Sequence, residues 1–447
     1  MVIVASIFVL IFSFILFRLA AGNLSLTRPH LISIIFYKDF VLWTFIGVVL
    51  IASSFDLNND LYFWGVTGHV HDQARFYGWL STMYTMIVFP IGMLLANFLI
   101  IRSLSANALL ASYYRKPFEV LLSHRESAVF ITLCCALFVS FAAILYTFHS
   151  MGNFPLFHLI KGTDAVTLAQ MRANAKIHFN GIAALRDVLA INLTFFLSLV
   201  CYGYKLFYGK GKFSSLFYVS FILVFFILTY NLEKGPVFWY LLSLFAIYIV
   251  YRGRLSVKGF VFFLLPVFFL IYVVFSFIAG ADDRIYAFAY RLFVAQSVAI
   301  FLGFEYFPLE HDFLGVDGIS RFYSYISGGE LINAGRLLFE IYSPAAIENN
   351  TAGFIVGLFN AESWMLFGVA GVLFIPISVG FFVQALNLFF LKSKKTPLYV
   401  GLYIYFWTKL SLTGSVAQFL YPVMFVVIFA VFFSVILFSK LLRGKPA

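Results

Sequence analysis

Apolar runs long enough to cross a lipid bilayer recur along almost the whole chain. A helix needs about 20 residues to cross a hydrocarbon core of ~30 Å. Of the 447 residues, 63% are hydrophobic and only 11% are charged, so few segments could fold around a soluble core. The sequence therefore predicts a membrane protein that crosses the bilayer many times.

Helices are expected in these spans because lipid offers no hydrogen-bond partners to an open backbone. A barrel would instead show segments of about 10 residues with alternating hydrophobicity, and none is seen. We expect one all-α integral membrane domain over residues 1–447, with about 11 transmembrane helices. The spans are predicted near residues 2–20, 40–56, 78–101, 127–147, 187–207, 214–231, 236–251, 259–279, 363–391, 397–414 and 419–439.

Basic residues set the expected orientation. The first span has no basic residue before it and Arg18 after it, so we expect a retained anchor whose N-terminus faces outward, not a signal peptide. One side of the membrane then collects 19 of the 30 Lys and Arg residues: Arg18, Arg28, Lys38, Arg102, Arg115, Lys116, Arg125, Lys205, Lys210, Lys212, Arg252, Arg254, Lys258, Lys392, Lys394, Lys395, Lys440, Arg443 and Lys445. The positive-inside rule places this side, and the C-terminus, in the cytoplasm. The net charge of +11 thus follows mostly from topology, and no nucleic-acid partner is expected.

Three longer segments fall outside in this orientation, at residues 56–77, 148–186 and 281–362. We expect the last to be partly helical and to cap an active site. The cytoplasmic connections contain no glycine-rich phosphate loop and no carboxylate pair suited to a nucleotide and magnesium. The sequence therefore predicts chemistry outside, with no cofactor.

Cations in the external segments are spaced for helical faces. Arg172 and Lys176 are four residues apart, and Arg284 and Arg291 are seven apart, so each pair shares a face. Guanidinium groups donate paired hydrogen bonds in a fixed fork, which suits a diphosphate. The alternative is that these arginines reach the membrane interface or pair with nearby aspartates such as Asp187.

Further cations are candidates for the same substrate. Lys234 lies in an outer turn, where it could join a phosphate site or simply reach water. Lys409 falls inside a predicted span, where a charge is costly without a partner or a wet cavity, so we expect a functional or paired role. Arg321 and Arg336 add positive charge to the large external segment.

Two sets of histidines and carboxylates could carry other chemistry. Glu310 and His311 lie in the large external segment, where either could accept a proton from a hydroxyl. His69 and His71 form a two-ligand fragment, but no third ligand follows at a recognisable spacing. We expect no metal, and solvated loop positions remain the alternative for all of these residues.

A family resemblance rests on several of these segments. The chain has many spans, an external segment Gln170–Asn174 that contains Arg172 and leads to Gly181, and a large later external segment with further arginines. That segment closes with Asn350–Gly357, and Phe367–Gly371 opens the next span. This arrangement is similar to the bacterial O-antigen and oligosaccharide-repeat polymerases of the Wzy type, within the superfamily that also contains the O-antigen ligases.

The resemblance implies a fold like that of membrane-embedded glycosyltransferases that use polyprenyl-linked donors. It implies transfer of a growing glycan from undecaprenyl diphosphate to a second lipid-linked repeat unit, at the outer face of the bacterial cytoplasmic membrane. A chain-length regulator protein is a further partner that it suggests. We assign Arg172, Arg284 and Arg291 to the diphosphate, and His311 or Glu310 to the base. The expected substrate-binding residues are Lys176, Lys234, Arg321, Arg336, Lys409 and Asn350.

Two other functions remain open. An O-antigen ligase would use the same donor, but related ligases commonly have a histidine before the asparagine of the closing motif, where this chain has Asn349. A flippase or transporter of lipid-linked oligosaccharide would also gather cations, but more often within spans around a central cavity. The spans as predicted contain one clear case, Lys409.

Overall fold

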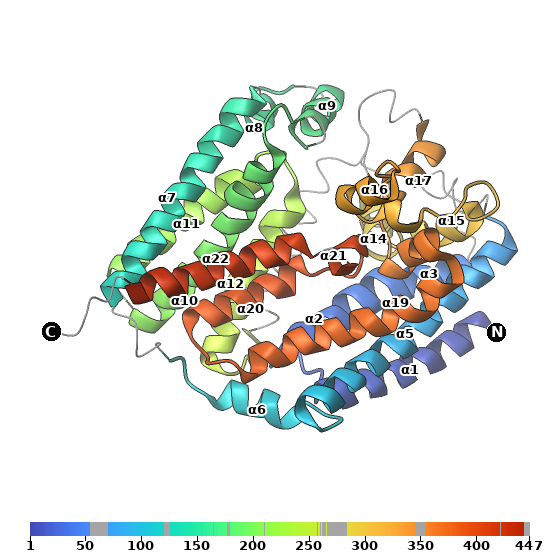
Figure 1. The fold of residues 1–447 in the computed structure, drawn as a ribbon, viewed down its shortest axis with the longest axis horizontal. Helices are drawn as coiled ribbons and strands as arrows, with labels where there is room; N and C mark the ends of the chain where they lie inside the picture. Colours follow the sequence, from blue (N-terminus) through green and yellow to red (C-terminus); the bar gives the residue numbers. More distant parts are fainter. Residues whose placement is uncertain are drawn as a thin grey trace.

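The computed structural model is helical, with no strand in the part of the chain that it describes (Figure 1). The structure describes residues 1–53, 70–119, 126–152, 154–163, 165–176, 179–209, 211–256, 258–259, 261, 265, 284–344, 354–420 and 422–441. Most of the predicted external segment 56–77, with His69, lies outside these residues, as do nearly all of the predicted span 259–279 and Asn350.

Short helices alternate with long ones along the chain. The first half contains α1 (Val2–Ala21), α2 (Leu31–Ile35), the π-helix η1 (Phe36–Phe45), α3 (Ile46–Ala52), α5 (Asp72–Ile101), α6 (Asn107–Arg115), α7 (Glu126–Met151), α8 (Pro155–Ile160), α9 (Ala165–Lys176), the π-helix η2 (Leu185–Leu193) and α10 (Thr194–Tyr208). The second half contains α11 (Lys212–Leu228), α12 (Lys234–Arg252), α14 (Arg284–Phe293), α15 (Val298–Tyr306), the 3₁₀ turn η3 (Gly315–Gly318), α16 (Arg321–Ser327), α17 (Ala334–Tyr342), α19 (Phe359–Lys392), α20 (Pro397–Lys409), α21 (Ala417–Leu420) and α22 (Val423–Leu441).

Seven helical stretches among the described residues are long and apolar enough to cross a membrane. They are Val2–Ala21, Leu31–Ala52, Asp72–Ile101, Glu126–Met151, Leu185–Tyr208, Gly235–Arg252 and Phe359–Lys392. Shorter apolar helices at Lys212–Leu228 and Phe425–Phe438 match two more of the predicted spans. The helical, multi-pass class predicted from composition is thereby confirmed, whereas the total of about 11 spans remains a prediction.

Two predicted spans have different boundaries in the structure. The second begins at Leu31, nine residues before the predicted start at residue 40, so Lys38 lies inside it and not in a cytoplasmic connection. The span predicted at 397–414 stops being helical at Lys409. The following residues are rich in Ser, Thr and Gly, whose side chains or backbone freedom compete with helical hydrogen bonds.

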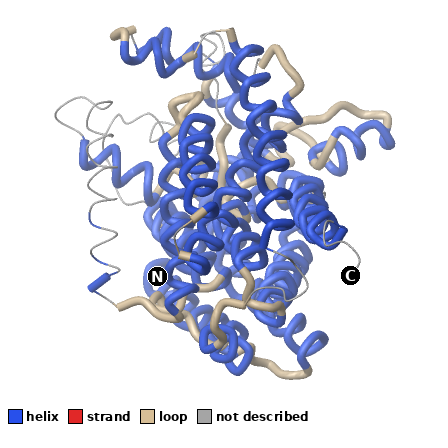
Figure 2. Tube along the Cα trace, turned by 90° about the vertical axis from the view of Figure 1, so that its left-hand side faces the viewer, coloured by secondary structure: helices blue, strands red, loops and turns tan. Residues whose placement is uncertain are grey.

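The long helices form two groups that pack into one bundle (Figures 1 and 2). One group contains α1, α3, α5 and α19, and the other contains α7, α10, α11, α12, α20 and α22, with α20 also contacting α2 and α19. In Figure 1, α8 and α9 lie at the top, α15, α16 and α17 lie at the upper right, and the N-terminus lies at the right edge; we call the end with these helices the cap end. Helix α6 lies at the bottom of the view and α22 ends at the left, both away from the cap end. Helices from two predicted external segments, 148–186 and 281–362, thus lie at one end of the bundle. Which membrane face this end occupies remains a prediction.

Helices α5 and α19 approach most closely at two glycines. A Cβ atom at Gly92 would collide with the carbonyl oxygen of Ile377, and one at Gly380 with the carbonyl oxygen of Phe89. Small residues allow such close backbone contact between membrane helices, where packing replaces the hydrophobic effect as the driving force. This contact holds the first group of helices together.

We expect Gly92→Ala and Gly380→Ala each to lower the free energy of unfolding by about 1–3 kcal/mol, because the backbones must separate. Thermal unfolding of the purified protein in detergent measures this loss. Gly235→Ala is the matched control, because no atom lies within 4 Å of a Cβ built there. Equal melting temperatures for all three variants would contradict the packing argument.

Candidate functional site

An irregular segment lies inside the bundle where α20 ends. Leu410, Leu412 and Val416 are completely buried, and the segment from Leu410 to Val416 continues into the short helix α21. The carbonyl oxygen of Leu412 accepts a hydrogen bond of 2.8 Å from the N–H of Phe359 at the start of α19. Non-helical backbone at membrane depth is tolerated only where protein or a water-filled cavity surrounds it, so such segments are often binding sites. We call it the 410–416 segment.

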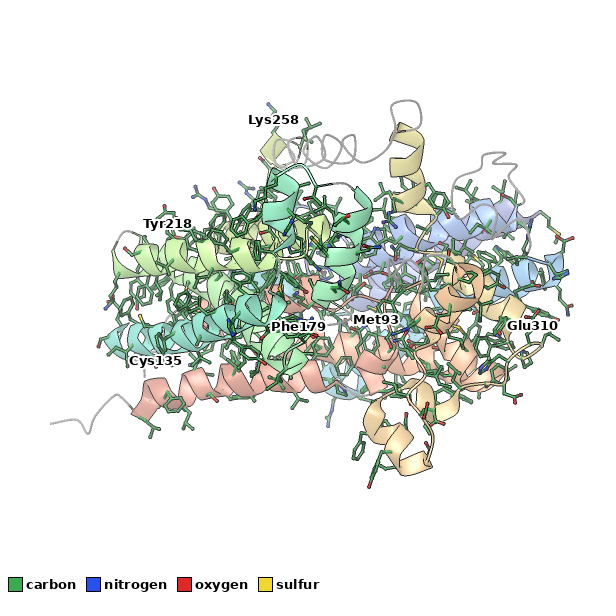
Figure 3. All side chains as sticks on the ribbon, turned by 90° about the horizontal axis from the view of Figure 1, so that it is seen from above. Met93, Cys135, Phe179, Tyr218, Lys258 and Glu310 are labelled. Atoms are coloured by element: carbon green, nitrogen blue, oxygen red, sulfur yellow. The ribbon has the colours of Figure 1, made fainter. Side chains whose placement is uncertain are left out.

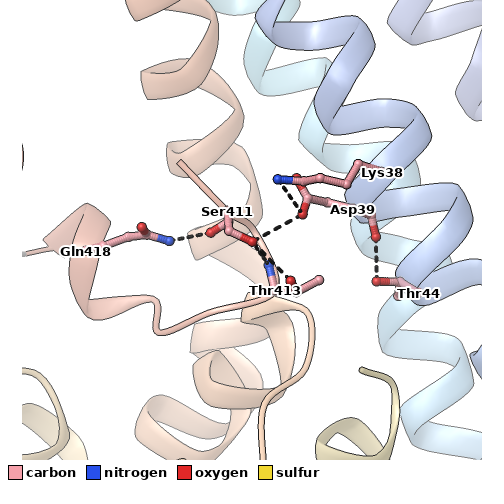
Figure 4. Close-up of polar contacts among 6 residues, drawn as sticks. All are labelled: Lys38, Asp39, Thr44, Ser411, Thr413 and Gln418. Carbon is pink, nitrogen blue, oxygen red and sulfur yellow. Dashed lines mark hydrogen bonds and ion pairs between the residues drawn. The ribbon is translucent and has the colours of Figure 1, made fainter. Parts of the chain in front are cut away.

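A buried ion pair contacts one side of this segment. Lys38 and Asp39 are adjacent in the π-helix η1, with 3.5 Å between Lys38 Nζ and Asp39 Oδ1 and side chains that are 8% and 0% exposed. Ser411 Oγ donates to the same Asp39 oxygen at 3.3 Å (Figure 4). The other oxygen, Oδ2, has no hydrogen-bond partner among the described residues. Lys38 Nζ also lies 5.0 and 5.1 Å from the ring centres of Trp43 and Trp239, which gives its charge cation–π contacts.

A second buried carboxylate contacts the other end of the segment. Glu362, in the first turn of α19, is 8% exposed. Its Oε1 accepts a hydrogen bond of 2.9 Å from Ser415 Oγ, and its Oε2 accepts one from the backbone N–H of Val416. Glu362 therefore fixes the far end of the 410–416 segment, as Asp39 fixes the near end.

Basic residues from three elements gather where the segment begins. Lys409 is partly buried at the end of α20, and its Nζ lies 4.8 Å from the centre of the Phe195 ring. The carboxylates of Glu233 and Asp187 lie near enough to attract its positive charge electrostatically. Arg186 is buried and donates to both oxygens of Asp187, at 2.8 and 3.1 Å. Together with Arg172 these residues form what we call the basic cluster: Arg172, Arg186, Asp187, Glu233 and Lys409.

Arg172 reaches the cluster from α9. Its Nε donates to the carbonyl oxygen of Asn231 at 3.0 Å, two residues before Glu233, while the side chain as a whole stays exposed. The guanidinium therefore has donors left for a ligand at the cap end. The cluster carries three cations against two carboxylates, so it can attract an anion.

Two of the other predicted cations have described side chains, and both are exposed. Arg291 is exposed on α14, and Arg336 forms an exposed pair with Glu340 at 2.7 Å, as the alternative of loop ion pairing allows. For four further predicted residues the structure describes only the backbone. Lys176 lies at the end of α9, and the other three begin helices: Lys234 in α12, Arg284 in α14 and Arg321 in α16. Asn350 lies outside the described residues.

The predicted base is distant from the basic cluster. Glu310 is exposed, and His311 Nδ1 lies 2.7 Å from the carbonyl oxygen of Asp312. Figure 3 shows Glu310 far along the long axis of the molecule from Phe179, whose ring stacks 4.7 Å from the Arg186 guanidinium. The prediction that Glu310 or His311 acts beside the arginines therefore finds no support in the arrangement.

Metal ligands do not converge either. The described residues include no group of three or more His, Cys, Asp or Glu side chains placed to hold a metal ion. His71 instead bonds Glu305, and this hydrogen bond together with the Glu305 charge raises the pKa of the exposed His71 imidazole. The pair joins the start of α5 to α15 at the cap end.

Four buried charged residues of the site are not among the residues predicted from the sequence: Lys38, Asp39, Arg186 and Glu362. The predicted span begins at residue 40, which puts Lys38 in the cytoplasm, and Glu362 comes just before the predicted span that begins at residue 363. A usable signal for the first pair was the apolar run from Leu31 to Tyr37, which extends the span in front of it. Adjacent opposite charges inside such a run predict a buried pair.

Comparison with known proteins gives no match, whether with protein-family models, with curated proteins or with solved structures. Function must therefore be inferred from the site. The basic cluster can hold a phosphate or diphosphate, and the 410–416 segment offers backbone and hydroxyl groups beside it.

Proposed function

We propose that this protein polymerises undecaprenyl-diphosphate-linked oligosaccharide repeat units at the outer face of the bacterial cytoplasmic membrane. The observation that carries the proposal is the basic cluster, in which Arg172, Arg186 and Lys409 come together from α9, η2 and α20. A lipid-linked diphosphate presents its charge at this depth, between the apolar chain in the bilayer and the glycan outside. The resemblance to Wzy-type polymerases supports the same reaction.

The reaction transfers a glycan between two lipid-linked molecules. The hydroxyl oxygen of the acceptor sugar forms a bond to the anomeric carbon of the donor glycan, the bond from that carbon to the diphosphate oxygen breaks, and the hydroxyl proton passes to water. Undecaprenyl diphosphate leaves with the added negative charge. Arg172 and Lys409 stabilise that charge, while Arg186, already bonded to Asp187, positions the cluster.

The first test is a glycan gel on cells that lack this chain. Loss should replace the polysaccharide ladder by single repeat units, and the native sequence should restore it. We expect Arg172→Ala to reduce polymerisation about 10-fold to 100-fold, as loss of one or two charge-assisted hydrogen bonds would. Arg115→Ala, which removes an exposed arginine from α6 at the opposite end, should restore the full ladder.

Other gel outcomes identify the alternatives. Long polymer that accumulates on undecaprenyl diphosphate in the deletion strain indicates a ligase. Single units trapped on the cytoplasmic side indicate a transporter. If the Arg172→Ala protein is stable and restores the full ladder, Arg172 does not act in the site.

Transport is the second candidate function, and one observation favours it. Lys38, Asp39 and Glu362 are buried charged groups within spanning helices, beside an interrupted helix. Transporters commonly place coupling groups and substrate at such discontinuous helices. The sequence predicts one clear charge within a span, Lys409, and this small number argues against transport. The three further buried charges weaken that argument, so the side of the membrane on which single repeat units accumulate becomes the deciding measurement.

A further inference from the structure

A small cavity, lined mostly by apolar residues with a few polar side chains, lies beside the far end of the 410–416 segment. Its volume is about 190 Å³, and it is lined by α15, the start of α17, the stretch 354–358, the start of α19 and the 410–416 segment. The polar or backbone-exposing residues in its wall are Asn333, Gly335, Gly357, Glu362, Gly414 and Ser415. Drug-sized ligands occupy pockets of roughly 300–1,000 Å³, so this cavity suits a smaller group such as one sugar ring.

The wall chemistry matches a sugar. Glu362 is a buried carboxylate at the cavity, and Asn333 and Ser415 add an amide and a hydroxyl. Carboxylates and amides bond hydroxyl groups, while Met365 and Ala299 offer apolar surface to the C–H face of a ring. Arginine and lysine are absent from the described wall, so the cavity does not suit a phosphate.

The cavity and the basic cluster are connected by one stretch of chain. Lys409 belongs to the cluster and Ser415 to the cavity, and six residue steps span at most roughly 21 Å even when fully extended. A donor diphosphate at one end and an acceptor sugar at the other would thus be held within the length of a short oligosaccharide.

We propose that this cavity binds the terminal sugar of the acceptor glycan, with Glu362 as a positioning residue. The inference rests on the proposed function and adds the place of the second substrate to it. Both Glu362 oxygens accept hydrogen bonds from the 410–416 segment, so the carboxylate fixes the position of Ser415 in the cavity wall.

Gly414 offers a direct way to fill the cavity. A Cβ atom built there meets only Ser411 O at 3.8 Å and Gln418 Nε2 at 3.9 Å, which are ordinary contacts. Gly414→Ala therefore adds a methyl group at the cavity wall without a backbone clash, and Gly414→Val adds a larger side chain there. Glu362→Gln preserves shape and removes charge, and Glu126→Gln, at a half-exposed pair with Lys212, is its matched control.

Binding is measured on the purified protein in nanodiscs by thermal shift, with two probes. Sugar-free undecaprenyl diphosphate reports binding at the basic cluster alone. The lipid-linked repeat unit isolated from the deletion strain reports binding at both the cluster and the cavity. We expect wild type and Gly414→Val to bind undecaprenyl diphosphate equally, and Gly414→Val to bind the repeat unit at least tenfold more weakly, with Gly414→Ala between them. Glu362→Gln should weaken binding of the repeat unit but not of undecaprenyl diphosphate, and Glu126→Gln should change neither affinity.

The outcomes separate this inference from the proposed function. If deletion leaves the polysaccharide ladder intact, the proposed function is wrong and the acceptor cavity is rejected with it. If deletion removes the ladder but Gly414→Val and Glu362→Gln bind the repeat unit and polymerise like wild type, only the cavity assignment is wrong. Should Gly414→Val fail to fold, Gly414→Ala and Glu362→Gln decide the question by the same two affinities.

Discussion

Lys409→Met should slow polymer formation by about 10²–10³-fold, the loss expected when one charged donor to a leaving group is removed. Methionine has a similar length and can place its thioether against the Phe195 ring in place of the ammonium, so the end of α20 should remain packed. Arg186 still neutralises Asp187 in the variant, which limits the effect on folding. Lys409→Arg, which retains the charge, should recover part of the rate.

The rate is measured with purified protein and lipid-linked repeat units, as polymer formed per enzyme per minute. Lys440→Met, at the exposed end of α22, is the matched control and should behave as wild type. A Lys409→Met protein that polymerises at the wild-type rate would show that this ammonium does not act on the diphosphate. Equal loss of activity in Lys409→Met and Lys409→Arg would instead indicate a requirement for the shape of lysine.

Sequence alone could single out Arg172 and Lys409 but could not bring them together. Lys409 is recognisable because a charge interrupts an apolar run, and Arg172 because it belongs to a polar segment between spans. Their shared site depends on contacts between distant parts of the chain: Arg172 bonds the backbone of Asn231, and Lys409 lies over Phe195. Helical periodicity reports which residues share a face of one helix, not which helices become neighbours.

The missed residues depend on where helices begin and stop. Hydropathy averaged over a span does not fix its ends, so the predicted span begins nine residues after the observed helix start at Leu31 and leaves Lys38 outside it. The same averaging carried the predicted span through Ser411 and Thr413, where the structure has irregular backbone. The Ser, Thr and Gly residues after Lys409 weaken the helix locally, but Asp39 and Glu362, which hold the irregular backbone in place, come from other helices and leave no signal around residue 410.

Asp39→Ala should lower the free energy of unfolding by about 3–5 kcal/mol, because it leaves the buried Lys38 ammonium without its counter-charge. Lys38 is only 8% exposed, so it cannot recover full hydration without disturbing η1. Its contacts with Trp43 and Trp239 compensate only in part, since cation–π contacts contribute about 0.5–2 kcal/mol. Thermal unfolding in detergent measures the loss, and an Asp39→Ala protein as stable as wild type would show that Lys38 is neutralised elsewhere.

The double variant Lys38→Met/Asp39→Leu separates the structural role of this pair from a functional one. Replacing both charges of a buried pair by apolar groups is often neutral or stabilising, so the double variant should be clearly more stable than Asp39→Ala alone. Ser411 Oγ keeps its 3.0 Å bond to Thr413 Oγ1, so the 410–416 segment retains an internal support.

Glycosyl transfer at the basic cluster does not use Lys38 or Asp39, so polymerisation predicts a normal glycan ladder from the folded double variant. Transport coupled through buried charges predicts the opposite, because the coupling groups would be gone. A stable double variant that leaves single repeat units on the cytoplasmic side would therefore decide for transport. A stable double variant that makes long polymer would decide for a polymerase in which the buried ion pair only stabilises the bundle.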